Sequence, residues 1–65
     1  MTIIINGERK TVSPGCTLLD IVRDYQLAGA FVMEINGEII DGSRFAEHRL
    51  QENDIMEIIR FVGGG

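Results

Sequence analysis

Two Asn-Gly pairs constrain the fold of this chain more than any other feature. Both residues of such a pair tolerate the positive φ angles of a type I′ turn, so Asn-Gly between two β-rich runs is the strongest short signal for a β-hairpin. The pairs are Asn6-Gly7, between residues 1–6 and 8–13, and Asn36-Gly37, between residues 31–36 and 38–40. The sequence therefore predicts two hairpins, one at the beginning of the chain and one in its middle.

One helix is predicted between the hairpins. Thr17 is a good N-cap, and Asp20 follows three residues later, as in a capping box. Residues 26–29 should close the helix, with Gly29 in the left-handed conformation. At about 100° per residue, one side of the helix is apolar. The residues on that side are Leu18, Ile21, Val22 and Tyr25.

The order of these elements predicts an α+β domain of five strands. Ser43 is expected to cap a short helical turn over residues 44–47, and residues 55–61 read as the last strand. A chain of 65 residues forms one domain. The simplest packing lays the helix across one face of the sheet and leaves the other face to solvent or a partner.

Alternation along the strands predicts which side chains lie on the open face of the sheet. Glu34 and Glu57 mark that face, because successive side chains of a strand point to opposite sides. Four apolar residues should share it, namely Ile4, Val32, Ile59 and Phe61. An apolar patch with a polar rim is a candidate binding surface, although scattered apolar residues are also normal on protein surfaces.

Composition argues against several classes of function. Ten acidic and six basic residues give a net charge of -4, which disfavours nucleic-acid binding. Cys16 and His48 are the only residues of their kinds, so neither an internal disulfide nor a zinc site with nitrogen and sulfur ligands is expected. No apolar run approaches the roughly 18 residues of a membrane span, and no signal peptide is apparent. We expect a cytoplasmic protein that binds no membrane.

Three glycines, Gly63, Gly64 and Gly65, follow the last strand. They are either a frayed terminus or a slender arm that presents the Gly65 carboxylate to another protein. A carboxylate, with its pKa of about 3.3–3.7, is inert toward nucleophiles until adenylation activates it. The chain has no Walker-type phosphate loop, so ATP and magnesium would be bound by a partner enzyme and no cofactor by this chain.

The chain resembles the ThiS family of sulfur carriers, which share the ubiquitin-like β-grasp fold. The resemblance covers nearly the whole sequence. Its matching features are Asn6-Gly7, Thr17-Leu18-Leu19, Ile35-Asn36-Gly37-Glu38-Ile39-Ile40, Arg44-Phe45-Ala46-Glu47 with Leu50 and Asp54, and the terminal glycines. It implies a β-grasp domain over residues 1–62 and a flexible tail over 63–65. It also implies that the first and last strands are parallel neighbours, with Ile4 beside Ile59.

The resemblance also implies a function, that of a protein co-substrate rather than an enzyme. A ThiF-like enzyme would adenylate Gly65, and a cysteine-desulfurase pathway would supply sulfur for a thiocarboxylate. A ThiG-like thiazole synthase would accept that sulfur for thiamine. Gly64 and Gly65 match the family's terminal pair, Gly63 is an extra glycine, and the apolar patch would dock the activating enzyme.

Three other functions are compatible with the same features. They are the small subunit of molybdopterin synthase (or another β-grasp sulfur carrier), a ubiquitin-like modifier of lysines, and a regulatory β-grasp module without terminal chemistry. Cys16 is interpreted as a small, partly buried apolar residue and not as a sulfur relay.

Overall fold

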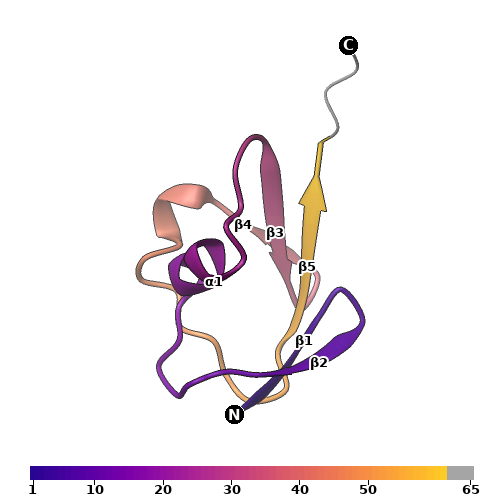
Figure 1. The fold of residues 1–65 in the computed structure, drawn as a ribbon, viewed down its shortest axis with the longest axis vertical. Coiled ribbons are helices and arrows are strands. Elements are labelled where there is room, and N and C mark those ends of the chain that lie inside the picture. Colours follow the sequence, from indigo (N-terminus) through magenta and orange to yellow (C-terminus); the bar gives the residue numbers. More distant parts are fainter. Residues whose placement is uncertain (62–65) are drawn as a thin grey trace.

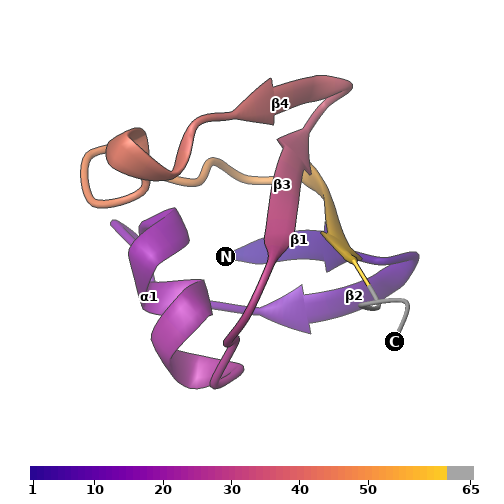
Figure 2. The same cartoon turned by 90° about the horizontal axis from the view of Figure 1, so that it is seen from above.

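Five strands form one mixed sheet in the order β2-β1-β5-β3-β4, with one helix on one of its faces (Figures 1 and 2). The computed structural model describes residues 1–61. The elements are β1 (Thr2–Ile5), β2 (Glu8–Thr11), α1 (Leu18–Asp24), β3 (Phe31–Ile35), β4 (Glu38–Ile40), the 3-10 helix η1 (Gly42–Arg44) and β5 (Ile55–Arg60). The predicted β-grasp architecture is confirmed.

Both Asn-Gly pairs form the predicted hairpin turns. Asn6 and Asn36 have φ angles of 48° and 51°, and Gly7 and Gly37 have φ angles of 83° and 89°. The turns join antiparallel strands, β1 with β2 and β3 with β4. Because a type I′ turn matches the right-handed twist of the strands, each pair specifies its hairpin locally.

A full capping box begins α1, as predicted. The Asp20 backbone N–H donates to Thr17 Oγ1 at 3.2 Å, and the Thr17 backbone N–H donates to Asp20 Oδ2 at 2.9 Å. The helix ends earlier than expected, because Gln26, with a φ of 50°, is the first left-handed residue after it. Gly29 takes its positive φ of 80° in the following loop.

The short helical turn also differs from the prediction. It spans Gly42–Arg44, and its N-cap is Asp41, whose Oδ1 accepts the Ser43 N–H at 2.8 Å. Ser43 is therefore inside the turn and does not cap it. The shift buries Phe45 directly after the turn, with its ring stacked on Phe31 at a centroid distance of 6.2 Å.

The core lies between α1 and the sheet. Its largest fully buried side chains are Ile3, Leu18, Ile21, Met33 and Met56. Each such side chain contributes about 1.5–3 kcal/mol through removal of apolar surface from water. A helix of seven residues is not stable alone, so this packing holds α1 in place. No helix in residues 1–61 is long and apolar enough to cross a membrane.

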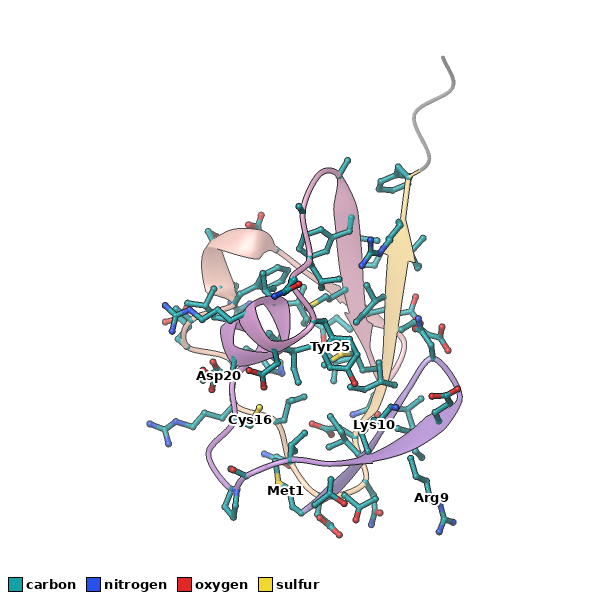
Figure 3. The ribbon with its side chains drawn as sticks, viewed as in Figure 1. Met1, Arg9, Lys10, Cys16, Asp20 and Tyr25 are labelled. Carbon is teal, nitrogen blue, oxygen red and sulfur yellow. The ribbon has the colours of Figure 1, made fainter. Side chains whose placement is uncertain are left out.

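Tyr25 was expected on the buried side of the helix but is 40% exposed. It caps the last turn of α1 and lines an open groove of about 480 Å³ between the helix and the β1–β2 hairpin. Lys10 lies across this groove, as Figure 3 shows. The side chain at the end of a short helix thus lies at the edge of the core and keeps contact with water.

β5 lies between β1 and β3, parallel to the first and antiparallel to the second. The parallel arrangement agrees with the prediction, but the register does not: Ile4 is the partner of Ile55, and Ile59 is the partner of Val32. The reason is that β1 joins the beginning of β5, where the Ile4 N–H donates to the Asp54 carbonyl at 2.9 Å. The later half of β5 extends past the end of β1.

Candidate docking face and C-terminal strand

The face of the sheet opposite α1 exposes an apolar surface centred on β5. Ile55, Ile59 and Phe61 are 51%, 41% and 59% exposed. Ile4 and Val32, on the two neighbouring strands, are partly exposed. The structure therefore brings the four residues predicted for this patch onto one face, and it adds Ile55 between them. We call these five residues the docking face.

Ile39 is a further exposed apolar residue that the prediction missed. It is 62% exposed and lies opposite Glu34, the residue that marked the open face. The signal was present in the sequence, because a hairpin across Asn36-Gly37 pairs these two positions. Strand β4 has only three residues, which is too short for alternation alone to reveal the face.

Two glutamates lie on the same side of the sheet as the docking face. Glu57 lies between Ile55 and Ile59 along β5, and its cross-strand partner is Glu34. Two like charges directly opposite each other in a sheet are destabilising. Within residues 1–61 the side-chain ion pairs are Lys10–Glu8 at 3.2 Å and Arg44–Glu47 at 3.9 Å, so neither relieves this repulsion.

The docking face extends to Phe61, which precedes the terminal glycines in the sequence. Pairing with β3 continues to Phe61, whose N–H donates to the Ala30 carbonyl at 3.1 Å. The end of β5 lies far from the N-terminus (Figure 1). Gly63, Gly64 and Gly65, and the predicted domain boundary after residue 62, lie outside the described residues.

Cys16 lies in a setting that suppresses its reactivity. It is buried next to the first turn of α1, close to Asp20 (Figure 3). Burial raises the pKa of its thiol, and the charges of Asp20 and Asp24 raise it further. Because the thiolate is the nucleophile, this environment disfavours a sulfur relay at Cys16.

Comparison with known proteins agrees with this architecture. The sequence model of the ThiS family matches residues 3–65. The sulfur carrier protein ThiS of Bacillus subtilis (strain 168) is 44% identical over 50 residues, which cover 75% of this chain and 76% of that protein. A thiazole synthase of Paramagnetospirillum magneticum (strain ATCC 700264 / AMB-1) is 32% identical over the whole chain, which spans only 20% of that protein.

Solved structures agree as well. The crystal structure of the thiamine biosynthesis protein ThiS from Geobacter metallireducens has a TM-score of 0.84 at 26% identity, with full coverage of both chains. A solution structure of a thiamine biosynthesis protein from the same organism has a TM-score of 0.81 at 25% identity and covers this whole chain and 88% of that one. The chain belongs to the ThiS family, the β-grasp sulfur carriers of thiamine biosynthesis.

Proposed function

We propose that this chain carries sulfur as a thiocarboxylate on Gly65 and donates it for the thiazole ring of thiamine. One observation carries the proposal: the ThiS family match extends through residue 65 and so includes all three terminal glycines. Gly63 and Gly64 have no Cβ atoms, so the arm before the reactive carboxylate can enter a narrow slot in an enzyme. The chain is the substrate in this chemistry, and the enzymes are its partners.

The proposed chemistry begins with activation of the Gly65 carboxylate. A carboxylate oxygen attacks the α-phosphorus of ATP, and pyrophosphate leaves. A persulfide from a cysteine-desulfurase system then attacks the acyl carbon and displaces AMP. A thiol reduces the resulting acyl disulfide, which releases the Gly65 thiocarboxylate and leaves a disulfide between the two thiols. A ThiF-like adenylyltransferase binds the ATP and its magnesium, because this chain has no Walker-type motif for either. We propose that this takes place in the cytoplasm.

We further propose that the docking face binds the activating enzyme. It is an apolar surface on the strand that leads to the glycines, and exposed apolar surfaces with polar rims are typical of protein interaction sites. The opposed Glu34 and Glu57 favour a partner surface with a basic group, which would offset their repulsion. Cys16 takes no part in the transfer.

A ThiG-like thiazole synthase is the proposed sulfur acceptor. The relative from Paramagnetospirillum magneticum supports this, since a protein named thiazole synthase contains a segment similar to the whole of this chain. A carrier-like segment and a thiazole synthase that are joined in one polypeptide in a relative are good candidates to bind each other as separate chains.

Adenylation kinetics with a ThiF-like enzyme test the docking face. Ile59→Asp and Phe61→Asp should raise KM for this protein by about tenfold or more, because each places a charge in a desolvated interface. Tyr25→Asp, which adds the same charge on the helix side, is the matched control, and circular dichroism establishes that each variant is folded. Unchanged kinetics in both docking-face variants would remove the docking face from the proposal.

A further inference from the structure

The Asn6 side chain holds β5 from the side of β1. The Ile58 N–H donates to Asn6 Oδ1 at 2.7 Å, and Asn6 Nδ2 donates to the Ile58 carbonyl at 3.4 Å. The Asn6 backbone N–H donates to the Met56 carbonyl at 2.9 Å. One residue therefore bonds two successive positions of β5 that face β1.

These side-chain bonds replace the backbone hydrogen bonds that a longer β1 would make to Ile58. In a parallel pair every second residue bonds the neighbouring strand. The Ile4 N–H donates to Asp54 and the Asn6 N–H donates to Met56, so in a longer β1 the Asn6 backbone carbonyl would accept the Ile58 N–H. The chain instead turns away at Gly7. Without the Asn6 side chain, the pairing of β5 with β1 would stop at Met56.

Within residues 1–61, Ile58 is the last residue of β5 with a hydrogen bond on the β1 side, and it lies opposite Met33 of β3. Ile59 and Phe61 of the docking face follow it. Within the part of the chain that the structure describes, Ile59 pairs with Val32 of β3, and the Phe61 N–H donates to the Ala30 carbonyl just before β3. The position of these two side chains relative to Ile4 and Ile55 therefore depends on how firmly Ile58 is held. Asn6 supplies that hold without being part of the docking face.

We propose that Asn6 is a positioning residue for the activation of this carrier. Its side chain fixes the end of β5, so that Ile59 and Phe61 meet the activating enzyme in one arrangement. This role rests on the proposed function, because it assumes that an enzyme docks on β5 and acts on the terminus. The same hydrogen bonds predict a property of the free protein. The Ile58 amide should be protected from hydrogen exchange by the Asn6 side chain.

Asn36 provides a matched comparison at the other end of the same strand. The Ile55 N–H donates to Asn36 Oδ1 at 2.9 Å, and the Asn36 N–H donates to the Ile55 carbonyl at 2.8 Å. Asn36 Nδ2 also donates to Asp54 Oδ1 at 3.0 Å. It occupies the same position of the same turn type as Asn6, but it holds the beginning of β5.

The test compares Asn6→Gly with Asn36→Gly, since glycine removes each side chain and keeps the positive φ. We expect Asn6→Gly to speed amide exchange at Ile58 and to raise KM for ThiF-like adenylation about threefold to tenfold, as for the loss of a hydrogen bond, with kcat unchanged. Asn36→Gly should lose at least as much global stability, because Asp54 loses a donor. It should still keep KM within about twofold of wild type, because Ile55 keeps its pairing with Ile4 and its bond from the backbone N–H of residue 36. Asn6→Asp keeps an oxygen that can accept the Ile58 N–H. Its KM should therefore be close to that of wild type and lower than that of Asn6→Gly.

Each contrary result has a separate meaning. Equal increases of KM in the two glycine variants, or no faster exchange at Ile58 in Asn6→Gly, would overturn the role of Asn6 alone. A failure of Asn6→Asp to lower KM below that of Asn6→Gly would also overturn it. A wild-type protein that no ThiF-like enzyme adenylates would overturn the proposed function, and with it any role of Asn6 in the reaction.

Discussion

Glu34 and Glu57 lie directly opposite each other across β3 and β5, beside the exposed apolar residues of the docking face. Ile55 and Ile59 flank Glu57 along its strand. A cross-strand pair of like charges lowers the stability of a sheet. The free protein thus has an unfavourable pair at the place where we propose that a partner binds, and a basic group on that partner would make the pair favourable.

Glu57→Gln should stabilise the free protein. Removal of one charge ends the repulsion with Glu34 and should raise the free energy of unfolding by roughly 0.2–1 kcal/mol, with the larger gain at low ionic strength. Urea unfolding at two salt concentrations measures it. Glu38→Gln is the control, since Glu38 lies opposite the apolar Ile35. Equal gains in the two variants would show that net charge, and not the opposed pair, is responsible.

Met56→Ala should destabilise the protein severely. Met56 is fully buried between α1 and the sheet, and truncation of such a side chain costs about 2–5 kcal/mol because a cavity remains. That is a large part of the roughly 5–15 kcal/mol that keeps a small domain folded. Ile55→Ala changes the preceding residue, on the opposite face, and should cost much less. Similar midpoints of thermal unfolding for the two variants would contradict the assignment of the faces.

The capping box of α1 should make stability depend on acidic pH. The Thr17 backbone N–H lowers the pKa of Asp20 below its ordinary value of 3.8, with smaller contributions from the Thr17 side chain and Arg23, and burial opposes them. A lowered folded-state pKa means that the carboxylate stabilises the folded state above the unfolded-state value. That contribution is lost as the pH falls through the lower, folded-state pKa.

Comparison of wild type with Asp20→Asn measures this effect. The difference in unfolding temperature between the two should be largest near neutral pH and should shrink as the pH falls below the ordinary carboxyl pKa. Thr17→Ala removes the partner hydroxyl and should cost about 1 kcal/mol near neutral pH. A difference between wild type and Asp20→Asn that stays constant down to strong acid would contradict the capping-box account.

Cys16 should be slow to alkylate and dispensable for sulfur transfer. Burial and the charges of Asp20 and Asp24 raise the pKa of its thiol, so little thiolate is present at neutral pH. Iodoacetamide should modify native Cys16 more slowly than the same residue in the unfolded chain, and Asp24→Asn should speed the reaction. Cys16→Ala should still form the thiocarboxylate. Loss of thiocarboxylate formation in a folded Cys16→Ala protein would show that Cys16 takes part in sulfur transfer.

Features that depend on local chemistry were predicted from the sequence. The two Asn-Gly turns and the Thr17–Asp20 capping box each require particular residues at neighbouring positions, so a few letters suffice. Alternation placed Met56 in the core and Ile59 on the open face, because one buried face fixes the register of every side chain in a strand.

Features that depend on distant contacts were not predicted. Ile4 is aligned with Ile55 and not with Ile59. This register depends on the position at which the long connection before β5 brings the strand into the sheet, and no short motif encodes that position. Helix α1 ends before the predicted position because Gln26, and not Gly29, is the first residue after it with a left-handed conformation. Asn6 and Asn36 were recognised as turn residues, but their side-chain bonds to β5 arise only when the last strand enters the sheet.

Mass spectrometry of the C-terminal peptide tests the central claim most directly. The protein is incubated with a ThiF-like enzyme, ATP and magnesium, a cysteine desulfurase with cysteine, and a thiol reductant. It is then compared with a reaction that lacks ATP and with a Gly65-deleted chain. The expected result is replacement of one oxygen by sulfur at Gly65, only when ATP and Gly65 are both present. A terminal peptide of unchanged mass, or attachment of Gly65 to lysines in place of sulfur loading, would contradict the account.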